Sequence, residues 1–137
     1  MTRCLKAFML TTDTLFIVYW TASLLHLIGA FNMPPDLMYA DYAQARVFAW
    51  NWSFFPVDVL FSLSGFAAVR FSAQNHPRWR PFALISLCLT FVAGLMAVGY
   101  WTILGEFDPG WYLPNLTLVI WPLFFLPGLL KSTVAEK

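Results

Sequence analysis

Four apolar runs dominate this sequence, and each is long enough to cross a lipid bilayer as a helix. They cover residues 8–28, 50–69, 81–104 and 111–130. A helix rises about 1.5 Å per residue, so about 20 residues cross a hydrocarbon core that is about 30 Å thick. The sequence therefore predicts an all-α integral membrane protein, a four-helix transmembrane bundle formed by residues 1–137 as a single domain.

The composition supports a membrane protein and argues against a protein that binds nucleic acid. Hydrophobic residues make up 60% of the chain and charged residues 11%, against about 25% charged in soluble proteins. Most of the apolar surface must meet membrane lipids or another membrane protein. No basic surface with interleaved aromatic residues is present, which argues against binding of nucleic acid.

Lysine and arginine residues indicate the orientation of the bundle. Connections on the cytoplasmic side of a membrane protein carry an excess of these residues. The pattern predicts a multi-pass protein of the cell membrane with both termini in the cytoplasm. The residues expected on the cytoplasmic side are Arg3, Lys6, Arg70, Arg78, Arg80, Lys131 and Lys137, against Arg46 alone on the other side.

The connection between the first and second runs is the only long one. It begins with a turn at Pro34, Pro35 and Asp36, and residues 37–48 then mix aromatic with charged side chains. Such a mixture is typical of a helix at the membrane interface. We expect a short interfacial helix between spans one and two, and a lid over the mouth of the bundle is the alternative.

Asp58 lies well inside the second apolar run. An acidic residue near the middle of a spanning helix costs about 2.5–3.5 kcal/mol, so such residues usually face a bundle interior or an aqueous cavity. At about 100° per residue, Asn51, Ser62 and Gly65 fall on the same helix face as Asp58. The second span should therefore turn this polar face inward.

The first run also contains polar residues. Thr12, Tyr19, Ser23 and His26 share one helix face, which predicts a second inward polar stripe. Asp13 lies beside this stripe. We interpret it as a carboxylate near the start of a helix, where the helix dipole favours negative charge.

These stripes predict a ligand-binding cavity near the outer leaflet. We expect Asp58 at its floor, with Asn51, His26 and Asn115 around it, and tryptophan rings that face a bound cation. The candidate ligand-binding residues are Asp58, Asn51, His26, Tyr19, Trp20, Trp52, Trp101, Asn115 and Glu106.

The sequence gives no sign of a metal site or a cofactor. His26 and His76 are expected on opposite sides of the membrane, and no His or Cys pair has the spacing of helical metal ligands. Cys4 and Cys88 are expected at different depths, so we interpret both as structural thiols. We expect neither a metal nor a cofactor.

Several blocks of residues resemble a known family. They are Asp13, residues 19–20 and 25–28, residues 49–56 with Asp58, and residues 111–116 and 122–125. Together they resemble the YvaD-like family of small bacterial membrane proteins with four spans. The resemblance implies the four-span fold and transfers no catalytic residue. In architecture alone, the chain is similar to the sterol-isomerase and sigma-2-like bundles, which enclose a lipid cavity with a carboxylate.

Several functions stay open at this point. The first is binding of a lipophilic small molecule or lipid, including one that bears an amine. The second is a structural or regulatory subunit of a membrane complex, with a homo-oligomer or another membrane protein as partner. The third is a lipid-modifying enzyme with His26 and Asp58, or Glu106, as acid and base. The last is a proton-coupled or small-ion carrier that depends on Asp58.

Overall fold

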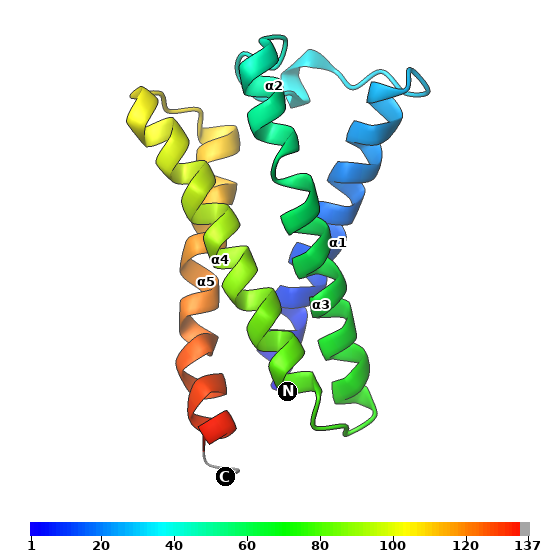
Figure 1. The fold of residues 1–137 in the computed structure, drawn as a ribbon, viewed down its shortest axis with the longest axis vertical. Helices are drawn as coiled ribbons and strands as arrows, with labels where there is room; N and C mark the ends of the chain where they lie inside the picture. The colour runs from blue at the N-terminus through cyan, green and yellow to red at the C-terminus, as the bar shows by residue number, and fades with distance from the viewer. Residues whose placement is uncertain (135–137) are drawn as a thin grey trace.

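The computed structural model describes residues 1–134, except for the side chains of Asp36 and residues 132–134. It contains four long helices, α1 (Arg3–Leu27), α3 (Phe55–Ala73), α4 (Trp79–Leu104) and α5 (Pro109–Val134). A short helix α2 (Ala45–Trp52) precedes α3, and a 3-10 turn, η1, covers Pro35–Leu37 (Figure 1). Four helical segments are long and apolar enough to span a membrane, so the predicted four-span fold is confirmed.

The second span consists of two helices, α2 and α3, with a break at Ser53 and Phe54. Pro56 has no N–H group and cannot donate to the carbonyl of Trp52, which disturbs the helix at this point. At the break, the carbonyl of Trp50 accepts both the Ser53 hydroxyl at 2.6 Å and the Ser53 N–H at 3.2 Å. As a result, Asp58 lies in the first turn of a new helix.

The interfacial helix predicted for residues 37–48 is wrong in its position. Asp41 has a φ of 58°, in the left-handed region, and the N–H of Gln44 donates to the carbonyl of Asp41 at 2.8 Å. This turn ends the irregular segment, and α2 begins only at Ala45. The short helix is therefore the beginning of the second span.

The four long helices pack in chain order. α1 packs on α3, α3 on α4, and α4 on α5. Small residues allow close approach of neighbouring helices. A Cβ atom on Gly94 would lie 2.7 Å from the Cβ of Leu118 and 2.8 Å from the carbonyl oxygen of Asn115, so α4 and α5 are in near contact here.

The two ends of the bundle differ. We call the end that carries both termini and residues 74–78 the terminal end, and the end that carries residues 28–44 and 105–108 the loop end. α1 and α4 diverge from each other toward the loop end (Figure 1). At the terminal end, all four long helices contribute to one buried apolar cluster, the terminal cluster, which consists of Leu5, Met9, Ala68, Ala83, Leu87, Trp121 and Leu129.

Candidate functional site

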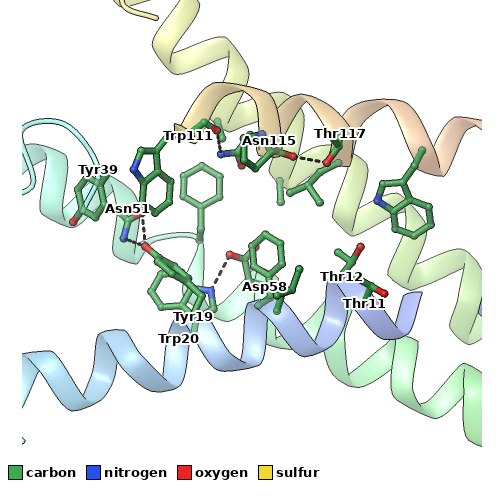
Figure 2. Close-up of a pocket in the computed structure, with 18 of the residues that line it drawn as sticks. Thr11, Thr12, Tyr19, Trp20, Tyr39, Asn51, Asp58, Trp111, Asn115 and Thr117 are labelled. Carbon is green, nitrogen blue, oxygen red and sulfur yellow. Dashed lines mark hydrogen bonds between the residues drawn. The ribbon is translucent and has the colours of Figure 1, made fainter. Parts of the chain in front are cut away.

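A cavity of about 680 Å³ lies between the diverging helices. Its wall is mostly aromatic and aliphatic, and it is lined by residues of all five helices together with Tyr39 of the 28–44 connection (Figure 2). Phe8 of α1 stacks on Trp121 of α5 at 5.4 Å between ring centroids, and both residues line the cavity toward the terminal end. We call this space the main cavity.

Asp58 is the acidic residue in the wall of the main cavity and is only 3% exposed. The indole N–H of Trp20 donates to Oδ2 of Asp58 at 2.9 Å (Figure 2). The other oxygen, Oδ1, is buried and has no hydrogen-bond partner within residues 1–134. One carboxyl oxygen of Asp58 is therefore held in place, and the second is free to contact a ligand. The prediction that Asp58 faces inward is confirmed.

The break before α3 adds an electrostatic contribution. Asp58 lies in the first turn of α3, and the N-terminal turn of a helix carries a partial positive charge. This partial charge stabilises a carboxylate. No lysine or arginine lines the main cavity, so the helix end and the Trp20 N–H group are the positive groups that the described residues bring to Asp58.

Aromatic rings surround the contact between Trp20 and Asp58. The ring of Trp20 lies 5.0 Å from Tyr19, 5.2 Å from Trp52 and 5.1 Å from Phe55, and all three pairs are edge-to-face, with interplanar angles of 62–68°. Edge-to-face contacts of this kind fix ring orientation and are worth about 0.5–1.5 kcal/mol each beyond their area. They hold the Trp20 N–H group toward the carboxyl group.

A second, smaller cavity lies nearer the loop end. It has a volume of about 220 Å³ and is lined in part by Ser23, His26 and Trp52. Tyr19, Tyr39 and Asn51 line both cavities. The amide of Asn51 donates to the Tyr19 hydroxyl at 3.1 Å, which joins α1 to α2 at the boundary between the cavities. We call this second space the outer cavity.

The predicted site residues separate into three groups. His26 and Trp52 line the outer cavity, and Glu106 is exposed in the 105–108 connection and lines neither cavity. The lining of the main cavity continues past Asp58 to Ala7, Phe8 and Trp121, so Asp58 lies on its wall and is not its floor. The predicted residues that line the main cavity are Asp58, Asn51, Tyr19, Trp20, Trp101 and Asn115.

His26 and Asn115 make their hydrogen bonds to the backbone. Nδ1 of His26 accepts the N–H of Met33 at 3.2 Å, and this bond fixes the start of the 28–44 connection. The amide of Asn115 donates to the carbonyl of Trp111, one turn earlier in α5, at 2.7 Å. The donors of Asn115 are thus partly used within its own helix, and His26 is directed toward the connection.

Tyr39 is a residue of the cavity wall that the sequence analysis did not select. Tyr39 is only 4% exposed, although it lies in a polar connection, and burial raises its pKa to about 12. Its ring contacts Trp111 at 5.9 Å, and the indole N–H of Trp111 donates to the carbonyl of Met38 at 3.2 Å. The 28–44 connection is thereby held on α5 at the loop end. The aromatic residues within this charged segment were the signal for such a contact.

Trp121 is another residue of the cavity wall that the sequence analysis did not select. Its Nε1 atom is buried and has no hydrogen-bond partner within the described part of the chain. Because Trp121 lines the main cavity, it supplies a possible hydrogen-bond donor toward the terminal end. The cavity thus has an unpaired acceptor at Asp58 and an unpaired donor at Trp121.

Comparison with known proteins identifies relatives of this chain. Residues 5–136 match the model of a family of unknown function, DUF5360. The chain is 41% identical over 130 residues to the "Uncharacterized protein YvaD" of Bacillus subtilis (strain 168), which covers 95% of this chain and 94% of the relative. No solved structure gives a significant match. The predicted relationship to YvaD is confirmed, and the chain belongs to the DUF5360 family of unknown function.

Proposed function

We propose that this membrane protein binds a lipophilic molecule that carries a cationic amine, with the amine beside Asp58 in the main cavity. The observation that carries the proposal is the unpaired Oδ1 atom of a buried carboxyl group in a largely apolar wall. Ligand cavities are typically about 300–1,000 Å³ and apolar, with a few well-placed polar groups. The main cavity has this size and composition.

Each part of such a ligand has a matching surface. The ammonium group pairs with the Asp58 carboxylate, and the nearby ring of Trp20 offers a further attraction through its π face. The apolar body contacts side chains such as Phe16, Phe54 and Leu118, which line the same cavity. Specificity for a cation follows because an uncharged head group would leave the buried carboxylate without a counter-charge.

The enzyme alternative has less support from the arrangement of the candidate acid and base. A general acid and base act on the same substrate atoms and must lie within hydrogen-bond reach of them. His26 lines the outer cavity and Asp58 the main cavity, while Glu106 lies in an exposed connection. The subunit alternative makes a different prediction, because a purely structural Asp58 would not affect occupancy of the cavity.

Mass spectrometry of the purified protein tests the proposal. The wild type, Asp58→Asn and Asp41→Asn are extracted from the same membranes in mild detergent, and bound small molecules are quantified per protein chain. Asp41 is an exposed carboxylate in the 28–44 connection and provides a matched control. We expect a lipophilic amine in the wild type and in Asp41→Asn, and at least about tenfold less in Asp58→Asn, since 1.4 kcal/mol of a charge-assisted contact corresponds to a factor of ten. Equal occupancy in all three proteins would contradict the proposal.

We also propose that the terminal end lies on the cytoplasmic side of the cell membrane. Arg3, Lys6 and Arg70 are exposed at this end, as expected from the positive-inside rule, whereas Arg46 lies near the loop end. Lys137 lies outside the described residues. A cysteine introduced at Asn75, in a chain with Cys4 and Cys88 changed to serine, should resist an impermeant maleimide added to intact cells, and one at Glu106 should react. The reverse pattern would show that the orientation is inverted.

A further inference from the structure

Asp13 is a second buried acidic residue, and the proposed function does not use it. α1 begins at Arg3, so Asp13 lies in the interior of the helix and is only 1% exposed. Its Oδ2 atom is buried without a hydrogen-bond partner among the described residues. Neither cavity is lined by Asp13. The interpretation of Asp13 as a carboxylate at a helix start is therefore wrong, and its burial requires another explanation.

The carboxyl group of Asp13 lies directly against the backbone of α3. A Cβ atom on Gly65 would overlap Oδ2 of Asp13 and would lie 2.7 Å from its Cγ atom. Gly65 thus provides the space that the carboxyl group fills. Ser62, one turn away on α3, and Ser86 on α4 are also fully buried, and neither hydroxyl has a hydrogen-bond partner among the described residues. Asp13, Ser62 and Ser86 are thus all closed to solvent.

The nearest titratable groups do not provide a counter-charge. On α3, Asp58 lies two turns from Gly65 and carries the same sign of charge, while Arg70 lies in the last turn toward the terminal end and is exposed. On α1, the exposed Lys6 lies two turns toward the terminal end. On α4, Cys88 is exposed. On α5, Lys131 is in the last turn, at the terminal end. A carboxylate in the closed contact would therefore be buried and unpaired, which proteins tolerate poorly.

We propose that Asp13 is a proton-binding site that holds α1 against α3. The neutral acid fits the closed contact with Gly65, while the carboxylate requires water and separates the two helices. Acidic conditions therefore favour the closed bundle, and loss of the proton at higher pH favours the open one. This inference goes beyond the proposed function, because it concerns a different carboxyl group and needs no ligand.

The packing of α1 allows such a movement. Leu5 and Met9 anchor its first turns in the terminal cluster, whereas farther along the helix its main neighbour is α3. α1 contributes Thr12, Phe16 and Trp20 to the wall of the main cavity. A tilt of α1 about its anchored end therefore moves the loop end of the helix most and widens the main cavity. The Asp13 proton would thus control the size of that cavity.

Distances between spin labels test the movement without any ligand. Labels are attached to cysteines at Leu25 on α1 and Ile103 on α4, two exposed positions near the loop end, in a chain with Cys4 and Cys88 changed to serine. The distance distribution is measured by pulsed electron resonance in lipid nanodiscs at acidic and alkaline pH. We expect a longer distance at alkaline pH in the wild type. Asp13→Asn, which cannot ionise, should keep the short distance at both pH values.

Two further variants make the test decisive. Asp41→Asn should respond to pH as the wild type does, because Asp41 is an exposed carboxylate in the 28–44 connection and is not part of the contact between α1 and α3. Gly65→Ala should show the long distance at both pH values, since its methyl group occupies the place of the Asp13 carboxyl group. The proposal is overturned if the wild type shows no change with pH, if Asp13→Asn responds as the wild type does, or if Gly65→Ala remains closed. It is also overturned if the response is lost in Asp41→Asn and kept in Asp13→Asn.

Discussion

The terminal half and the loop half of the bundle use similar apolar residues and have different interiors. In the terminal half, the side chains of Met9 and Leu87 are fully buried beside Ala68 and Ala83, and the four long helices meet in the terminal cluster. Toward the loop end, α1 and α4 diverge, and aromatic rings surround the main cavity, which extends back to Trp121 of the terminal cluster (Figures 1 and 2).

This comparison shows what determines helix packing in a membrane. Lipid chains are as apolar as leucine side chains, so hydrophobicity alone does not draw spanning helices together. Small residues allow contact in the terminal cluster and between α4 and α5 at Gly94, whereas large rings and single hydrogen bonds hold α1 in register with α2 and α3 beside the main cavity. We therefore expect the terminal half to determine stability and the loop half to determine binding.

The largest expected effect on stability is in the terminal cluster. Met9→Ala should lower the free energy of unfolding by about 2 kcal/mol, because it leaves a void among fully buried side chains. This loss is at the lower end of what truncation of a buried methionine costs in soluble proteins, because lipid also solvates apolar groups. Thermal unfolding in detergent measures the change. Met96→Ala on α4 is the control, because Met96 is 55% exposed and should be nearly neutral. Similar losses in both variants would show that the terminal cluster has no special role in stability.

An intermediate effect is expected at the contact between α1 and α3. Gly65→Ala should lower the free energy of unfolding by about 1–2 kcal/mol, because the added methyl group overlaps the Asp13 carboxyl group. Asp13→Ala should recover part of this loss when the two changes are combined, since the methyl group then has space. Gly99→Ala is the control, because a Cβ atom there has no neighbour within 4 Å. If the losses in unfolding free energy of Gly65→Ala and Asp13→Ala simply add in the double variant, the close contact is contradicted.

The smallest expected effect is at the boundary between the two cavities. Tyr19→Phe removes the hydroxyl that accepts the Asn51 amide and should lower stability by about 1 kcal/mol. It should also increase the rate at which a cysteine at Thr12, in the main cavity, reacts with a small thiol reagent added from the loop end. Tyr42→Phe is the control, because Tyr42 lines only the outer cavity. Equal reaction rates in the two variants would show that the bond between Tyr19 and Asn51 does not separate the cavities.

The fold was predictable from the sequence because span length and apolar composition are local properties. Periodicity also predicted that Asp58, Ser62 and Gly65 share a buried face of α3, and this is confirmed. The break at Ser53 and Phe54 follows from Pro56, but its consequence for the helix dipole at Asp58 depends on where α3 begins.

The arrangement of helices around the site was not predictable in the same way. Periodicity indicates which face is polar, but it does not indicate which helix lies opposite that face. Asp13 appeared to be a helix-start residue because the apolar run begins near it, whereas α1 begins two to three turns earlier at Arg3. The sequence analysis assigned His26 and Trp52 to one site with Asp58. In the structure, both residues line the outer cavity. The first error concerns a helix boundary, and the second concerns the arrangement of segments that are distant in the sequence.

The most direct test of the proposed function compares a cation with an uncharged molecule of the same shape. Quenching of tryptophan fluorescence is titrated with a long-chain primary amine and with the alcohol of the same chain length, for the wild type and Asp58→Asn in the same detergent. We predict that the wild type binds the amine at least about tenfold more tightly than the alcohol, and that Asp58→Asn binds the two equally. A wild type that does not distinguish the amine from the alcohol would contradict the role assigned to Asp58.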